Sequence, residues 1–233
     1  MIKHKKRKIY FGLFWFFLVL SFILFASFLV FMANGYHLNT STLKLEKTGM
    51  VVVNGKIAGV TLILNGQEKK VDLPTRLNQL FPGQYSLIVK KENYYNYQKS
   101  FQLSGGQAVV IDNLTLFLTD PKIVHLSSND QTIAQIKKNN TLQSNQFILK
   151  NNEIWKNNKL ITRFSQVPIA AIYDANTDHY FVQLNDGIHA ILGDGSNNVL
   201  LVKLEKNTPV IMAINGSSLS YIIEDKIYQT QLW

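Results

Sequence analysis

The stretch IYFGLFWFFLVLSFILFASFLVFMA, residues 9–33, decides the architecture of this chain. It carries no charged side chain, and a helix of that length, rising about 1.5 Å per residue, covers the roughly 30 Å of hydrocarbon in a bilayer. Residues 1–8 carry five lysines and arginines, and the first acidic residue after the stretch is Glu46. Because Lys and Arg are retained on the cytoplasmic side, we expect a single transmembrane helix with a cytoplasmic N-terminus.

The length of the apolar stretch favours an uncleaved signal-anchor over a cleaved signal peptide. The apolar region of a signal peptide spans about 7 to 15 residues and ends at a cleavage site of small residues. The best candidate end here, Phe31-Met32-Ala33, places a bulky residue where a small one is needed. We therefore expect residues 9–33 to stay in the cell membrane, with the lipid bilayer as their partner and the rest of the chain outside the cytoplasm.

Composition and motifs exclude several classes of function. The chain of 233 residues has a net charge of +9, but five of these charges set the orientation of the anchor, and the others form no basic stripe and no nucleic-acid-binding motif. There is no cysteine, so the ectodomain uses no disulfides, which suits a prokaryotic envelope. No nucleophile elbow, phosphate-binding loop, dinucleotide fingerprint or zinc-protease motif occurs. We expect no nucleic-acid partner, no cofactor and no enzymatic activity.

Short apolar runs separated by turn signals predict an all-β ectodomain. Residues 34–47 are polar without a sustained period and are expected to form a stalk. Residues 48–118 contain five expected strands, enough for a small β-sandwich. These strands cover residues 50–53, 60–64, 84–91, 97–103 and 108–118. Alternation places on one face of their strand Tyr85, Leu87 and Val89, then Tyr97, Lys99, Phe101 and Leu103, then Val110, Leu114, Leu116 and Leu118.

Three dipeptides in the same region are predicted turns. Asn54-Gly55 and Asn65-Gly66 each follow an apolar run, as the turn of a β-hairpin does. Pro82-Gly83 has proline to fix φ at the second turn position and glycine to supply a positive φ at the third. Pro74 lacks a backbone N–H and is not expected inside a central strand.

Three segments follow one another in a recognisable order: GVTLILNG (59–66), LPTRLNQLFPGQYSL (73–87) and ENY (92–94). This order resembles the PEGA domain family, which has a Gly-Ala-x-Val strand ending in Asp-Gly or Asn-Gly, a Pro, a Leu-x-x-Leu, a Pro-Gly-x-Tyr and a Gly-Tyr. The resemblance covers residues 48–118. It implies a small transthyretin-like β-sandwich on a prokaryotic surface protein, without catalytic residues and with a suggested association with the envelope or with carbohydrate.

The sequence departs from the family pattern at two places. The tetrapeptide that names the family is Ile57-Ala58-Gly59-Val60 here and keeps only its glycine. The family's Gly-Tyr is Asn93-Tyr94, and asparagine is the next best residue where a positive φ is needed.

Residues 119–233 contain a weak internal repeat. Residues 147–155, 181–189 and 221–228 are each a strand, a short turn of Asn or acidic residues, and a second strand beginning with isoleucine and a ring. The copies are spaced by about 34 and 40 residues, near the blade period of β-propellers. Further strands are expected at residues 200–204 and 210–214. Residues 130–141 are the nearest to a helical period, but Asn139-Asn140 argues against much of a helix.

A closed propeller usually needs four to eight blades, which is more than this repeat supplies. We therefore expect either a partial, open antiparallel module resembling a propeller or a piece of a longer chain. The end of the sequence directly after a strand slightly favours a truncated propeller.

Tyr94, Tyr95 and Trp155 are the candidate binding residues. Aromatic rings at a strand edge can stack on sugar rings, although the sequence favours the simpler interpretation that Tyr97 is a core residue and Tyr95 a solvent-facing residue of the sheet. Two polar clusters resemble metal sites but lack ligands. A calcium loop starting at residue 174 has His179 and Asn185 where glycine and glutamate are needed. His179 and His189 supply only two of the three or four ligands that zinc requires, so we expect no metal.

These observations favour a single-pass membrane protein of a prokaryotic envelope with a non-catalytic ectodomain. That ectodomain is expected to bind cell-wall glycan or a surface protein, or to act as a spacer. One alternative is a sensory ectodomain that signals through a membrane partner, although a cytoplasmic segment of residues 1–8 is short for that role. Another is a wall-active enzyme with its site in residues 119–233.

Overall fold

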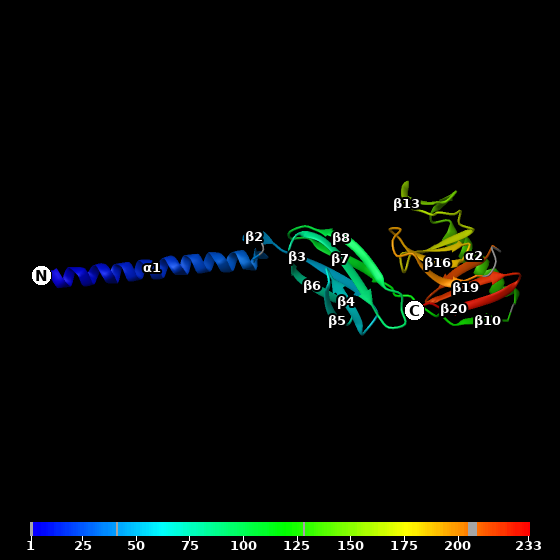
Figure 1. Ribbon diagram of the computed structural model, residues 1–233, viewed down its shortest axis with the longest axis horizontal. Helices are drawn as coiled ribbons and strands as arrows, with labels where there is room; N and C mark the ends of the chain where they lie inside the picture. The colour runs from blue at the N-terminus through cyan, green and yellow to red at the C-terminus, as the bar shows by residue number, and fades with distance from the viewer. Residues whose placement is uncertain (1, 41, 128, 205–208) are drawn as a thin grey trace. The chain divides into compact units, whose positions relative to one another are not determined.

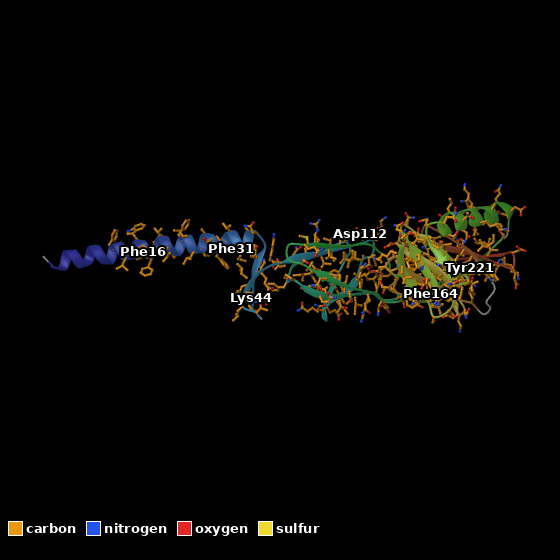
Figure 2. All side chains as sticks on the ribbon, turned by 90° about the horizontal axis from the view of Figure 1, so that it is seen from above. Phe16, Phe31, Lys44, Asp112, Phe164 and Tyr221 are labelled. Carbon is orange, nitrogen blue, oxygen red and sulfur yellow. The ribbon has the colours of Figure 1, made fainter. Side chains whose placement is uncertain are left out.

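The computed structural model describes residues 2–40, 42–127, 129–204 and 209–233, with side chains from residue 11 onward (Figure 1). Helix α1 runs from Ile2 to Ala33. Within it, Phe11–Ala33 is long and apolar enough to cross a membrane, and none of that segment is buried inside the protein. Figure 2 shows Phe16 and Phe31 projecting from the helix. The expectation of an apolar N-terminal helix that can span a bilayer is thereby confirmed.

A β-hairpin occupies the segment expected to be a stalk. Strand β1 (Tyr36–Asn39) pairs antiparallel with β2 (Lys44–Lys47). The Glu46 carboxylate accepts hydrogen bonds from the Asn39 side-chain amide and the Thr42 hydroxyl, each at 3.1 Å. Strands of four residues are too short for alternation to reveal them, which is why the sequence pattern did not predict this hairpin.

The next region contains seven strands in two sheets. They are β3 (Gly49–Gly55), β4 (Val60–Leu64), β5 (Gln67–Val71), β6 (Thr75–Leu80), β7 (Gly83–Lys90), β8 (Tyr97–Leu103) and β9 (Ala108–Leu114). One sheet has the order β6-β3-β9 and the other β5-β4-β7-β8. The predicted strands at residues 60–64 and 97–103 are confirmed with the same bounds. Strand β5 was missed because its sequence, QEKKV, is polar and mostly exposed.

Three local predictions in this region are wrong. Asn54-Gly55 is the end of β3 and not a turn. Gly83 opens β7, and a positive φ of 59° occurs instead at Gln79. In β9, Val110 is 51 % exposed. Asn113 has a φ of 54°, which breaks the alternation and leaves Ile111 and Leu114 buried together.

Two turn predictions are confirmed. Asn65 and Gly66 have φ values of 46° and 85°, and they connect β4 to β5 in a two-residue hairpin of the primed type. Asn93, which stands where the PEGA pattern has glycine, has a φ of 65°.

The C-terminal region contains a helix and three antiparallel sheets. Its elements are β10 (Ile123–Leu126), α2 (Asp130–Ser144), β11 (Ile148–Lys150), β12 (Glu153–Lys156), β13 (Lys159–Arg163), β14 (Ala170–Asp174), β15 (His179–Leu184), β16 (Gly187–Leu192), β17 (Val199–Lys203), β18 (Ile211–Asn215), β19 (Ser218–Ile223) and β20 (Lys226–Gln231). The sheets have the orders β11-β12-β13, β14-β15-β16-β17 and β10-β20-β19-β18. The three copies of the repeat are the hairpins β11–β12, β15–β16 and β19–β20, as predicted.

The strand order of the last sheet brings the two ends of this region together. Strand β10 pairs antiparallel with β20, from Ile123 opposite Thr230 to Leu126 opposite Ile227 (Figure 1). Strand β10, the first of the region, therefore lies at the edge of the sheet that contains the last hairpin, β19–β20. No sequence motif predicts this pairing.

Helix α2 overturns the expectation that residues 130–141 are not helical. The Asn129 side chain caps it by accepting a hydrogen bond from the Thr132 N–H at 2.7 Å. The Gln143 side-chain amide pairs in both directions with the backbone of Ile214, at 2.9 and 3.0 Å. Asn140, which argued against a helix, donates to the Met212 carbonyl at 2.8 Å. The helix thus covers the edge of β18, and tertiary contacts outweigh weak intrinsic propensity.

Buried apolar side chains gather in separate clusters in this region. One, packed on the hairpins β15–β16 and β18–β19, contains Phe117, Ile172, Phe181, Ile188, Ala190, Leu201, Val202, Val210, Met212, Ile214, Leu219, Tyr221 and Leu232. Another contains Ile154, Phe164, Tyr173, Tyr180, Val182, Leu184 and Ile191. Ile136 of α2 joins Ala213, Ile222 and Ile227 in a third. Phe164 and Tyr221 are labelled in Figure 2.

Candidate functional site

Tyr94 and Tyr95 lie where the chain approaches β8, and both are half-buried. Tyr94 forms an antiparallel bridge with Leu118, and the Tyr95 N–H donates to the Phe117 carbonyl at 2.8 Å. The Tyr95 ring packs against the buried cluster that contains Phe117. The two tyrosines therefore join their segment to residues 117–118, and a role for them in binding stays a prediction.

Trp155, on β12, has a different set of partners. Its indole N–H donates to the Glu153 carboxylate at 2.8 Å, and Arg163 donates to the same carboxylate at 2.7 Å. These two hydrogen bonds lower the pKa of Glu153. In the described part of the chain, no hydrogen bond or ring contact joins Trp155 to Tyr94 or Tyr95. The three residues chosen from the sequence are not brought together by any such contact.

The loop that resembles a calcium site is a turn closed by its own carboxylate. Asp174 is buried and accepts hydrogen bonds from the backbone and side chain of Asn176 and of Thr177, at 2.8 to 3.3 Å. Its oxygens are thus occupied by protein donors. Among the described residues, no group of three or more His, Asp or Glu side chains is placed to hold a metal ion. Residues 175–178 form a turn between β14 and β15.

The two histidines on the β15–β16 hairpin have separate environments. His179 is buried, with its Nδ1 2.6 Å from the Thr177 carbonyl oxygen and its ring meeting the Phe117 ring edge-on at 4.9 Å. His189 lies between Asp186, at 2.9 Å, and the Asn198 side-chain oxygen, at 2.8 Å. His179 is opposite Leu192 in the hairpin and not opposite His189. The two histidines therefore do not face each other across the hairpin, as ligands of one metal ion would have to.

A cluster of ionisable groups surrounds Tyr173. Its hydroxyl donates to the Asp178 carboxylate at 2.7 Å, and the Lys156 ammonium lies 3.4 Å from its ring centre. Burial raises the pKa of Tyr173, and the adjacent Asp178 raises it further. Burial also lowers the pKa of Lys156. The Tyr173 hydroxyl proton is hydrogen-bonded to Asp178, and the Lys156 ammonium makes a cation–π contact with the Tyr173 ring. We therefore interpret the cluster as a packing contact on β14.

A groove of about 600 Å³ lies among the described residues of this part of the protein. We call it the Trp233 groove. Its lining consists of Asn54, Gly55, Lys56, Ile57, Pro74, Asn113, Leu114, Thr115, Asn176, Thr177, Gly216, Ser217 and Trp233. This lining combines one large ring, three side-chain amides, three hydroxyls and one ammonium, and it contains no side-chain carboxylate.

Two of the three side-chain amides of the Trp233 groove are held by hydrogen bonds to carboxylates. Asn54 donates to the Asp112 carboxylate at 2.7 Å, and Asn176 donates to Asp174 at 3.2 Å. Asp112, labelled in Figure 2, is on β9 just before Asn113. The left-handed backbone of Asn113 is supported by its carbonyl, which accepts from the Thr115 hydroxyl at 3.0 Å. Side chains fixed in this way lose little conformational entropy when they bind a ligand.

The ring of the groove is positioned by the end of β20. The Leu232 N–H donates to the Ser217 carbonyl and the Leu118 N–H donates to the Leu232 carbonyl, each at 2.8 Å. Trp233 follows directly and meets the Phe117 ring edge-on at 5.7 Å. Trp233 is only partly buried, so its ring is shared between the core and the groove.

None of the groove residues was predicted from the sequence to bind a ligand. Its members come from loops that span residues 54 to 233, and each taken alone is an ordinary turn or strand-end residue. The only local signal was the number of Asn residues beside glycine or threonine. That pattern predicts turns and says nothing about which turns converge.

The burial of His179 predicts a loss of stability in mild acid. Burial lowers the pKa of His179 below its ordinary value of 6.5, against the opposing effects of the Thr177 carbonyl and of Asp178. The unfolded chain therefore binds a proton more readily than the folded chain. Stability is complete above about pH 6.5 and falls as the pH drops below it, by at most about 1.4 kcal/mol per pH unit for one group.

Thermal unfolding of the full chain in detergent micelles, followed at pH 7.5 and 5.5, measures this effect. His179→Gln, which keeps a side-chain N–H for the Thr177 carbonyl, is expected to flatten the difference between the two midpoints. An undiminished difference in His179→Gln would assign the acid sensitivity to other groups. Carboxylates are not responsible in this interval, since their ordinary pKa values lie near 4.

A search with protein-family models finds no match to this chain, and a search of curated proteins also finds none.

Proposed function

We propose that this chain is a membrane-anchored protein of a prokaryotic envelope whose β-rich ectodomain binds a partner outside the cytoplasm without catalysing a reaction. The observation that carries the proposal is α1: an apolar segment, Phe11–Ala33, that is unburied by the protein and precedes an almost entirely β ectodomain. An exposed apolar surface of this size needs a lipid environment.

The proposed ectodomain has two modules. In our proposal residues 48–118 form a PEGA-like β-sandwich, supported by the two sheets of β3 to β9 and by the left-handed Asn93. Residues 119–233 form a propeller-like module, supported by three repeated hairpins and by the pairing of β10 with β20. The groove with fixed amides and one exposed ring supports binding as its task. The partner is a wall polysaccharide or a surface protein.

Single cysteines test this topology, because the chain has none of its own. Lys5→Cys places a thiol before the anchor, and Lys138→Cys places one on the exposed face of α2. A membrane-impermeant maleimide is expected to label Lys138→Cys in intact cells and Lys5→Cys only after lysis. The unchanged, cysteine-free chain is the control for background labelling. Labelling of Lys5→Cys in intact cells, with Lys138→Cys protected, would contradict the proposed orientation.

A further inference from the structure

We propose that the Trp233 groove binds an acidic saccharide chain. The inference rests on the proposed function, because it names the ligand of the binding ectodomain. A groove that binds sugar must meet three demands: an apolar face for the C–H side of the ring, oriented groups for the hydroxyls, and access for a chain that continues beyond one ring. Each demand is met by a separate observation.

The ring face is supplied by Trp233. An indole is flat and apolar over its surface and carries one polar N–H at its edge, so it can cover a sugar ring and donate to one of its oxygens. In the described part of the chain the Trp233 indole N–H has no hydrogen-bond partner, and the ring is braced by Phe117 at 5.7 Å. The ring is therefore fixed and its polar edge is open.

The hydroxyl partners are the groove amides. A side-chain amide carries both a donor and an acceptor and matches two neighbouring hydroxyls of a sugar. Asn113 is exposed and makes no side-chain hydrogen bond within the described residues. Asn54 and Asn176 each use one N–H on a carboxylate behind the groove, at 2.7 and 3.2 Å, which orients the rest of the amide. Asn54 and Asn176 are thereby preorganised for a polyhydroxylated ligand, and the Asn113 amide is open to it.

Charge and access indicate an acidic chain that continues beyond the groove. Lys56 is exposed and is the only charged side chain in the lining. The neighbouring carboxylates of Asp112 and Asp174 accept hydrogen bonds from groove amides and do not line the hollow, so the Lys56 ammonium is the charge that favours a carboxylate or phosphate group of the ligand. The hollow, at about 600 Å³, lies within the roughly 300–1,000 Å³ of a ligand pocket. At Gly216 nothing lies within 4 Å of the position of a Cβ atom, so the hollow is open there to a chain that continues beyond one ring.

Fluorescence of Trp233 in the full chain, held in phosphatidylcholine nanodiscs, tests the proposal. The protein has three tryptophans, so Trp15→Phe with Trp155→Phe leaves Trp233 as the only reporter. The probes are a hexasaccharide of alternating glucuronate and N-acetylglucosamine, and the neutral hexamer of N-acetylglucosamine. We expect saturable change with both probes and tighter binding of the acidic one. The matched control, Trp15→Phe with Trp233→Phe, reports from Trp155 and is expected to stay unchanged.

Two groove variants make the test specific. Asn113→Gly removes the amide but suits the φ of 54°, and it is expected to weaken both probes by about tenfold. Lys56→Gln is expected to weaken only the acidic probe. Asn157→Gly, the same change at an exposed turn residue with a φ of 50°, is the control and should bind as the parent does.

Three results would overturn the proposal: no response of Trp233 to either saccharide, equal binding by Asn113→Gly, or equal binding of a glutamate hexapeptide, which would reduce recognition to charge alone. None of these results would contradict the proposed membrane anchor, because cysteine labelling reports only on α1 and on the side of the membrane where each residue lies. Conversely, an inverted topology would leave the in vitro affinity of the groove unchanged.

Discussion

Replacing Leu20 and Ile23 together by arginine is expected to release the chain from the membrane. Both side chains lie near the middle of Phe11–Ala33 and are exposed on α1. An arginine at the centre of a membrane helix costs about 2.5–3.5 kcal/mol on insertion scales, so two of them remove most of the preference of this segment for lipid. The measurement is the fraction of the chain that stays in the membrane pellet after an alkaline carbonate wash.

The paired control is Leu20→Ala with Ile23→Ala, which shortens the same side chains without adding charge. This variant is expected to stay in the pellet, because the remaining residues of the segment are still strongly apolar. Retention of the arginine variant at the level of the alanine variant would show that α1 is held by something other than the hydrocarbon of a bilayer.

The parts of the fold that sequence predicts are those decided within a few residues. The apolar stretch of α1 needs no partner to be recognised. Asn65-Gly66 makes a hairpin turn because asparagine and glycine both accept a left-handed backbone. The hairpin β19–β20 has a left-handed two-residue loop as well, at Glu224 and Asp225, and β15–β16 is also joined by a two-residue loop. Local chemistry is sufficient in each case.

The parts that sequence does not predict depend on residues far apart. Helix α2 has little apolar character, and Gln143 holds it to Ile214, 71 residues away. Strand β10 is placed by its pairing with β20, near the end of the chain. Asn113 shifts the buried face of β9 by one residue, and its left-handed backbone is not encoded by a glycine. Each of these features is decided by a contact that no local pattern contains.

The candidate site shows the same division. Tyr94, Tyr95 and Trp155 were chosen because aromatic rings are visible in a sequence, and the first two of them join chain segments in the fold. The Trp233 groove is built from turn residues whose convergence is a product of topology. Among the groove residues, only Trp233 is an aromatic residue of the kind that stacks on sugar rings. Its position after the last strand gives no local indication of a binding role.

Replacing Gly187 by alanine is expected to destabilise the C-terminal region strongly. An added Cβ would lie 2.0 Å from the Val202 carbonyl oxygen and 3.0 Å from the Lys203 Cα. Both are backbone atoms of β17, and Gly187 is paired with Lys203 in the sheet. The clash can be relieved only if β16 and β17 move apart. We therefore expect a loss of about 3 kcal/mol or more in the free energy of unfolding.

The contrast with Gly216→Ala, in the β18–β19 turn of the same region, isolates this clash from the ordinary effect of losing a glycine. Gly216 has a φ of 58° but nothing lies within 4 Å of its added Cβ, so only the backbone penalty of about 1–2 kcal/mol applies. Thermal unfolding of both variants of the full chain in detergent micelles, followed by tryptophan fluorescence, compares them directly. Because Trp155 and Trp233 both lie in the C-terminal region, their signal follows the sheets that contain Gly187. Equal midpoints for the two variants would mean that β16 and β17 yield to a methyl group, and that their close approach at Gly187 is not what holds this sheet in register.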